Sequence, residues 1–250
     1  MQYQTITSER EDAVVTVTLK RPEAQNRLNE RMARELSDVA QTVRDDSGVL
    51  VVVLQGGGGV FCAGLEPEAL ASEGPSLTAG ATAALAGLDR VLIAAVDGDC
   101  IGAGLDIALA CDIRLATPPS RFGFPEVSQG TIPSGGGTQR LPRIVGRGPA
   151  LSLLLLAETI EADEAFRIGL VNRVVPELQP ALQELIAILC SRGPIALRYA
   201  KEAIAKGLDM TLDQGLRLEG DLNFLLQTTV DRAEGVRAFL EKRAAQFHGS

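Results

Sequence analysis

Histidine is nearly absent from this 250-residue chain, whose one histidine, His248, lies close to the C-terminus. Tryptophan is missing, and tyrosine occurs twice. Ser–His–Asp and Cys–His catalysis both need a placed imidazole, and no GxSxG motif is present. Any acid–base chemistry in this chain therefore falls mainly to carboxylates.

Cysteine is also scarce, and its spacing argues against a metal site. Cys62, Cys100, Cys111 and Cys190 form no CxxC pair, and mixed Cys/His zinc sites need closely spaced ligands. The pattern is typical of buried free thiols in a reducing compartment. We therefore expect no bound metal.

Runs of positive charge and long apolar runs are missing as well. The net charge is −8, and no cluster of Lys and Arg stands out, which argues against nucleic-acid binding. The longest apolar candidate, residues 151–157, is too short to cross a membrane, and the polar N-terminus does not resemble a signal peptide. We expect a cytoplasmic protein without a nucleic-acid or membrane partner.

Strand patterns alternate with helix patterns along most of the chain. This alternation predicts an α/β fold with a largely parallel sheet that helices cover. From Pro194 onward the strand patterns stop, and only helices are predicted. Residues 72–82 are small and polar, and they are predicted to form a mobile loop. The predicted strands are 13–19, 49–54, 91–96, 113–116 and 171–175, and the main predicted helices are 29–46, 103–111, 149–157 and 162–168.

Two glycine-rich turns follow predicted strands. The first is QGGGGVFCAG at 55–64, and the second, Gly102-Ala103-Gly104, opens a predicted helix. Neither matches a P-loop or a dinucleotide-binding motif. Each is consistent with a plain structural turn. Parallel strands end at one edge of a sheet, however, where α/β proteins bind ligands, so a backbone amide from each turn could converge on one oxygen.

Two carboxylates, Asp106 and Glu126, accompany the second turn. Asp106 lies in the first turn of the predicted helix, where an acid also stabilises the helix dipole. Glu126 follows Pro125 and is equally consistent with a solvated loop residue. A carboxylate on each side of a helix-terminal amide suits proton transfer beside a stabilised oxyanion. Arg140 and Arg143 either neutralise a nearby acid or lie on the surface.

Together these segments resemble the enoyl-CoA hydratase/isomerase (crotonase) family over nearly the whole chain. The resemblance implies a crotonase-like spiral of ββα units with a C-terminal helical region. Residues 1–192 would form the α/β core with the acyl-CoA site, and residues 193–250 a helical trimerisation region. The segments that carry it are RPEAQNRLN at 21–29, VFCAGLE at 60–66, VDGDCIGAGLDIALACDIRLA at 96–116, FGFPEVSQGTIPSGGGTQRLPRIVG at 122–146, EADEAFRIGLVNRVV at 161–175 and AFLEKRAAQF at 238–247.

The resemblance assigns roles to the residues of the two turns. The family binds the thioester oxygen between two backbone amides, which map here to Leu65 and Ala103. Its two-carboxylate hydratases place acids at the positions of Asp106 and Glu126. Glu126 would deliver the α-proton, and Asp106 would hold the water that adds at C3. Such hydratases have Glu where this chain has Asp106, which is shorter by up to about 1.5 Å.

The resemblance also implies contacts to coenzyme A and an assembly. Arg27 stands where a small residue is common, and Glu66 where Asp is common. No cofactor is expected beyond the coenzyme A carried in the substrate. The expected partner is an acyl-CoA thioester, and the expected assembly is a homotrimer or a dimer of trimers. The predicted CoA- and substrate-binding residues are Arg27, Ala63, Gly64, Glu66, Phe239 and Lys242.

We therefore expect hydration of 2-enoyl-CoA to 3-hydroxyacyl-CoA, a step of fatty acid metabolism. Two alternatives remain open. One is an enoyl-CoA isomerase or acyl-CoA decarboxylase in which Glu126 alone moves the proton. The other is a catalytically weak acyl-CoA-binding homologue, which the short Asp106 suggests. The choice among them depends on Asp106.

Overall fold

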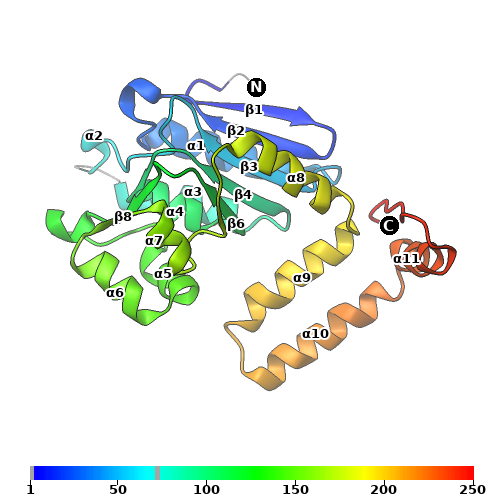
Figure 1. Cartoon of the computed structure of the whole chain (residues 1–250). Helices are drawn as coiled ribbons and strands as arrows, with labels where there is room; N and C mark the ends of the chain where they lie inside the picture. Colours follow the sequence, from blue (N-terminus) through cyan, green and yellow to red (C-terminus); the bar gives the residue numbers. More distant parts are fainter. Residues whose placement is uncertain (1–2, 71–73) are drawn as a thin grey trace. The chain divides into compact units, whose positions relative to one another are not determined.

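The computed structural model describes residues 3–70 and 74–250 (Figure 1). The chain forms two compact units, one made by residues up to 88 and 92–182, the other by residues 89–91 and 183–250. The first unit is α/β and the second is helical. The division falls inside helix α8 (Leu178–Cys190), before the predicted boundary at Arg192. The predicted division of roles between an acyl-CoA core and a trimerisation region stays a prediction.

The larger sheet of the first unit has the strand order β1-β2-β3-β4-β6-β9. β1 and β2 form an antiparallel hairpin, whereas β2 and β3, β4 and β6, and β6 and β9 pair in parallel. Every residue of β4 is buried, as its continuous apolar sequence requires for a strand covered on both faces. The strands of this sheet are β1 (Ile6–Glu11), β2 (Val14–Leu19), β3 (Val51–Gly56), β4 (Val91–Val96), β6 (Ile113–Ala116) and β9 (Arg173–Val174).

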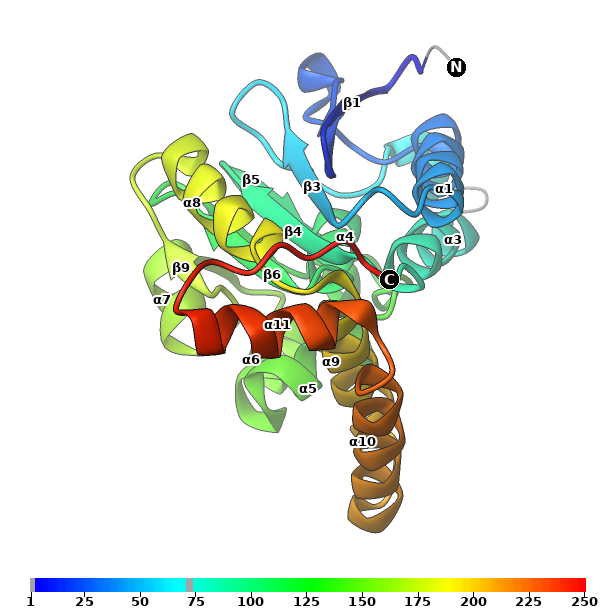
Figure 2. The same ribbon diagram turned by 90° about the vertical axis from the view of Figure 1, so that its right-hand side faces the viewer.

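Helix α1 (Glu30–Asp45) follows the predicted pattern. The Asn29 side chain accepts a hydrogen bond of 2.9 Å from the Met32 N–H and so caps the helix. Its apolar face is buried and packs against α3 (Gly74–Ala86), beside which it lies in Figure 2. The buried residues of this face include Met32, Leu36, Val39 and Val43.

The loop predicted at residues 72–82 is wrong for residues 74–82, which belong to α3; residues 72 and 73 lie outside the described residues. Thr78, Ala81, Thr82 and Leu85 are spaced as one helix face and are all buried. The Thr82 hydroxyl donates to the Thr78 carbonyl oxygen at 2.8 Å. The pattern was missed because two of the four buried positions are threonines, which the sequence alone marks as polar; a threonine hydroxyl can bond to a backbone carbonyl one turn earlier, as that of Thr82 does.

Short elements complete the first unit. Helices α4, α6 and α7 match the predicted helices 103–111, 149–157 and 162–168, whereas the three-residue strands and the two 3₁₀ helices were not predicted from the sequence. A small sheet has the order β5-β7-β8, in which β5 and β7 are parallel. In the part of the chain that the structure describes, no helix is both long and apolar enough to cross a membrane. The remaining elements are β5 (Asp99–Ile101), β7 (Arg121–Gly123), β8 (Thr159–Glu161), η1 (Pro22–Ala24), η2 (Glu126–Gln129), α2 (Pro67–Leu70), α4 (Ala103–Leu109), α5 (Gly137–Val145), α6 (Arg147–Leu155) and α7 (Ala162–Arg167).

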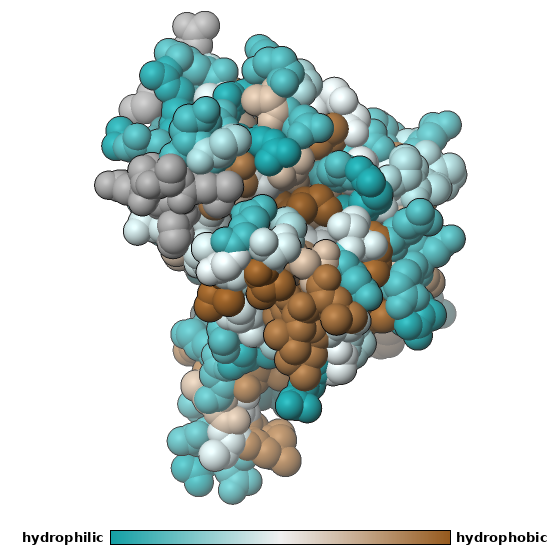
Figure 3. Space-filling model, turned by 90° about the vertical axis from the view of Figure 1, so that its left-hand side faces the viewer, coloured by the Kyte–Doolittle hydropathy of each residue, from teal (hydrophilic) through white to brown (hydrophobic). Residues whose placement is uncertain are grey.

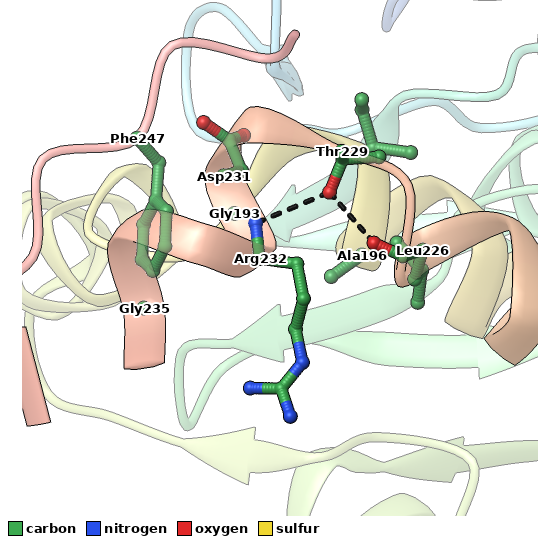
Figure 4. A pocket seen from close by; sticks show the side chains of 9 residues that line it. Gly193, Ala196, Leu226, Thr229, Asp231, Arg232, Gly235 and Phe247 are labelled. Atoms are coloured by element: carbon green, nitrogen blue, oxygen red, sulfur yellow. Dashed lines mark hydrogen bonds between the residues drawn. The ribbon is translucent and has the colours of Figure 1, made fainter. Parts of the chain in front are cut away.

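The second unit consists of helices α9 (Pro194–Gly207), α10 (Leu212–Leu226) and α11 (Val230–Glu241), followed by a tail. α9 and α10 pack side by side (Figure 1). The tail runs back along α11 (Figure 2), where the Asp231 carboxylate accepts hydrogen bonds from the backbone N–H groups of His248 and Gly249. Phe247 of the tail lines a cavity of about 210 Å³ beside α9 and α11 (Figure 4). The C-terminal tail therefore packs against the helices of the same unit.

Candidate active site

The two glycine-rich turns lie next to each other in the first unit. Cys62, within the first turn, forms a parallel bridge with Cys100, which precedes the second. The Cys62 N–H donates to the Asp99 carbonyl oxygen, and the Ile101 N–H to the Cys62 carbonyl oxygen, both at 2.9 Å. A Cβ on Gly102 would come within 3.7 Å of the Gly64 Cα. The two turns therefore lie side by side, as their positions after parallel strands predict.

The backbone N–H groups of Leu65, which directly follows the first turn, and Ala103, in the second, have no acceptor among the described residues. Leu65 pairs with Leu28 in a parallel bridge that does not use the Leu65 N–H. The Leu28 N–H donates to the Gly64 carbonyl oxygen, and the Glu66 N–H donates to the Leu28 carbonyl oxygen. Ala103 is the first residue of α4, where N–H groups have no intrahelical partner. Among the described residues neither N–H donates a hydrogen bond. Both are therefore available to an oxygen of a ligand.

Gly102 is a position at which only glycine fits. Its backbone has φ 54° and ψ −120°, which an L side chain rarely adopts. A Cβ there would also lie 2.6 Å from Oε1 of Glu126. The Glu126 carboxylate therefore lies directly against the turn that presents the Ala103 amide.

Glu126 begins the short helix η2 after Pro125. Its Oε2 is buried and accepts no hydrogen bond from the described part of the chain. Burial, first, and the nearby Asp106 carboxylate raise the pKa of Glu126 to about 7, against a partial lowering by its own backbone N–H. A carboxyl group with that pKa exchanges protons readily at neutral pH.

Asp106 lies in α4 and is 1% exposed. Its Oδ2 accepts a hydrogen bond of 2.9 Å from the Gly135 N–H, whereas its buried Oδ1 accepts none of ordinary geometry from the described residues. Burial raises the pKa of Asp106 to about 6, although the backbone amides of Gly135 and Gly137 and the charge of Arg140 counteract this rise. Asp106 and Glu126 thus form a coupled pair with raised pKa values.

Arg27 and Glu66, both predicted to bind coenzyme A, flank the first turn. The Arg27 Nη1 donates to the Leu65 carbonyl oxygen at 3.4 Å. The Glu66 carboxylate forms an ion pair with Arg21 and accepts from the Asn29 amide. Glu66 therefore braces the turn, and its contact with a ligand stays a prediction.

The remaining predicted binding residues fall into two groups. Ala63 and Gly64 belong to the first turn itself, and the Ala63 N–H donates to the Gln25 carbonyl oxygen. Phe239, which is 82% exposed, and Lys242, which ends α11 in a left-handed conformation, belong to the second unit. The geometry described above is complete without them, and their contact with coenzyme A stays a prediction.

Gly135, Gly137 and Arg140 adjoin Asp106 but were not assigned to the site from the sequence. The glycine run at 135–137 indicated only the start of a helix. A Cβ on Gly135 would lie 2.7 Å from both Cβ and Cγ of Asp106, so these glycines make room for the carboxylate. Gly135 and Asp106 lie 29 residues apart in the sequence, so no local pattern connects them. The run of three glycines was the one sequence feature that could have indicated a close contact.

The comparisons with known proteins agree over the full length of the chain. A sequence model of the family described as enoyl-CoA hydratase/isomerase matches residues 9–250. A crotonyl-CoA hydratase of Syntrophomonas wolfei is 38% identical, with 99% of each chain covered. A short-chain-enoyl-CoA hydratase of Clostridium acetobutylicum is 39% identical, with 97% of each covered. The crystal structure of an enoyl-CoA hydratase from Bacillus anthracis has a TM-score of 0.95 at 35% identity, covering 99% of this chain and 100% of its own. The chain therefore belongs to the enoyl-CoA hydratase/isomerase family and has its crotonase fold.

Proposed function

We propose that this protein adds water across the C2–C3 double bond of a 2-enoyl-CoA to give a 3-hydroxyacyl-CoA. The observation that carries the proposal is the juxtaposition of two buried carboxyl groups, Asp106 and Glu126, with two backbone N–H groups that donate no hydrogen bond among the described residues, those of Leu65 and Ala103. The relatives' names support it, since both are hydratases of short enoyl-CoA thioesters. We accordingly propose a short-chain substrate and a place in fatty acid metabolism.

The two unpaired amides would bind the thioester oxygen. As water adds at C3, negative charge moves onto this oxygen, and the N–H groups of Leu65 and Ala103 would stabilise it. Each such donor commonly contributes about 3–4 kcal/mol to the transition state. Because both donors are backbone groups, the methyl group of Ala103 does not remove them.

The two carboxyl groups would divide the proton transfers. Asp106, with the lower pKa, would be ionised and take a proton from the attacking water, whose oxygen bonds to C3. Glu126, with the higher pKa, would deliver a proton to C2. Burial raises both pKa values toward neutral pH, where each group can exchange a proton, and this supports the proposed roles. The chemistry requires no group beyond these residues, water and the coenzyme A of the substrate.

The exposed apolar side chains of the second unit support self-association, for which the expected assembly is a homotrimer or a dimer of trimers. Residues of α10 and α11 such as Leu212, Phe224 and Leu240 are 71–78% exposed, which is typical of a surface that another protein covers. We propose that copies of this chain cover it. The expected cytoplasmic location stays a prediction.

Product analysis with a panel of thioesters tests the proposed reaction. Purified protein should convert crotonyl-CoA to 3-hydroxybutyryl-CoA, and should leave 3-enoyl-CoA and malonyl-type thioesters largely unchanged. Asp106→Asn should lose hydration, because the water loses its base. Isomerisation of a 3-enoyl-CoA that survives in Asp106→Asn, with no hydration by the wild type, would instead assign the isomerase reaction. Binding of acyl-CoA without turnover of any thioester would assign the weak homologue.

A further inference from the structure

Three consecutive glycines, Gly135–Gly137, lead into α5, of which Gly137 is the first residue, and Gly135 and Gly137 pack against Asp106. A Cβ on Gly137 would lie 2.8 Å from Oδ1 of Asp106 and 2.5 Å from the Phe124 ring, and one on Gly135 would also meet Thr78. Space therefore demands glycine. Glycine is also the residue with the most backbone freedom, so the conformation of the amides that face Asp106 depends on contacts made by the segment. One such contact is the Gly136 carbonyl oxygen, which accepts hydrogen bonds from the backbone N–H groups of Gln139 and Arg140.

Arg140 supplies a constraint on this segment. Its Nη1 donates a hydrogen bond to the Gly135 carbonyl oxygen. Its guanidinium group lies where a side chain on Gly136 would project, and Gly136 has φ 101°. The peptide unit that Arg140 holds, between Gly135 and Gly136, stands between the two N–H groups that face Asp106. Arg140 thus fixes the middle of the glycine run.

The charged groups that face Asp106 come from two elements. η2 contributes Glu126, and α5 contributes Arg140, which is the cation that lowers the pKa of Asp106. α3 contributes the uncharged Thr78. Within the described residues, the charged groups near the Asp106 carboxylate are therefore one acid, Glu126, and one cation, Arg140.

We propose that Arg140 is a positioning residue for Asp106: by holding the Gly135 carbonyl oxygen it fixes the Gly135 N–H that orients the Asp106 carboxylate. This inference rests on the proposed role of Asp106 in hydration. Asp106 is a short acid held by one amide hydrogen bond, so its placement depends on that amide. A displacement of about 1 Å at a reacting group can reduce a rate about a hundredfold.

The test compares Arg140→Met with Arg143→Met. Arg143 is an exposed arginine of the same helix whose Nη1 donates to the Gln139 carbonyl oxygen at 3.0 Å, so its substitution removes the same charge without touching the glycine run. We expect Arg140→Met to reduce kcat for crotonyl-CoA by about 10- to 100-fold with KM nearly unchanged. The acidic limb of its pH profile should move to higher pH, because the cation that lowers the pKa of Asp106 is gone. Arg143→Met should match the wild type in all three respects.

A measurement without substrate separates this inference from the proposed function. The carboxyl carbon of Asp106, identified by its loss in Asp106→Asn, is titrated by carbon-13 NMR in each folded variant. We expect an upward shift in Arg140→Met and a smaller one in Arg140→Lys, which keeps the charge and one donor. If the wild type hydrates no thioester but the Gly135 amide proton exchanges faster with solvent in Arg140→Met than in Arg143→Met, the positioning role stands and the proposed function fails. If the titration, kcat and pH profile of both Arg140 variants equal those of Arg143→Met, the positioning role is overturned.

Discussion

At Asp106 and Glu126 the protein holds two carboxyl groups where water is scarce. Each group keeps one buried oxygen that no described protein group satisfies, and an unsatisfied buried acceptor is costly. The free-energy cost of such an oxygen is offset when a bound molecule supplies the missing hydrogen bond. A substrate and its water are the partners that the proposed reaction would bring.

The pH dependence of activity should report this pair. Hydration in the proposed roles needs Asp106 ionised and Glu126 protonated. With pKa values of about 6 and about 7, that combination is most populated between these two values. We expect a bell-shaped profile of kcat/KM for crotonyl-CoA with its maximum in this interval, whose limbs belong to the coupled pair. A rate that stays constant from about pH 5 to about pH 9 would contradict the assignment.

At the residue scale, the sequence pointed to two acids and two amides that lie together in the structure, because each belongs to a short continuous motif. It did not connect Arg140 to Asp106. That connection runs through Gly135, which meets Asp106 only in the folded chain. Contacts between distant segments depend on packing, which no local pattern records.

At the element scale, α4 presents the Ala103 amide because it docks closely on the first turn. Gly104 allows the helix backbone to come this close to Cys62, because a Cβ on Gly104 would overlap the Cys62 carbonyl oxygen. The helix α3, by contrast, packs through threonines as well as apolar residues. The sequence therefore predicted α1 and α4 well and mistook most of α3 for a loop. The short strands β5, β7 and β8 have three residues each, too few for a periodic pattern.

The docking of α4 leads to a prediction with a matched control. Gly104→Ala should destabilise the fold by about 1–3 kcal/mol, because the methyl group forces α4 away from the first turn. Hydration should fall as the Ala103 amide moves. Gly148→Ala, in α6 with open space around it, should be neutral or stabilise by up to about 1 kcal/mol. Thermal unfolding of both variants checks this, and equal stabilities would contradict the close docking.

At the scale of the whole molecule, the raised pKa values couple the site to stability. In the folded chain the pKa values of Glu126 and Asp106 lie above their ordinary values of 4.5 and 3.8, respectively. Both carboxyl groups therefore bind protons more tightly in the folded chain than in the unfolded chain. From about pH 4 to about pH 7 the native state therefore holds more protons than the unfolded state. Stability should fall as the pH rises through this window, and the loss should be complete above it.

Removing one acid should recover part of that stability. Glu126→Gln should be more stable than the wild type at pH 8 by up to about 3 kcal/mol, at about 1.4 kcal/mol for each pKa unit. The gain should vanish near pH 4, where both states are protonated. Melting temperatures at the two pH values measure it, with the exposed Glu9→Gln as control. A gain that does not depend on pH would contradict the raised pKa of Glu126.

The assembly is also a property of the whole molecule, and α10 offers a direct test. Phe224, 71% exposed, should be covered in the proposed trimer. Phe224→Asp should shift the mass found by light scattering from trimer toward monomer, because a buried charge without a partner is costly. The exposed Glu219→Gln should leave the mass unchanged. A wild-type monomer at micromolar concentration would refute the trimer.

The central claim is that Glu126 moves the proton in an enoyl-CoA hydration at this site. The most direct test is the rate of crotonyl-CoA hydration by Glu126→Gln relative to the wild type, measured on folded protein at saturating substrate. A positioned general acid contributes about 10²- to 10⁴-fold, so the rate should fall within that range. A rate within about threefold of the wild type would contradict the account.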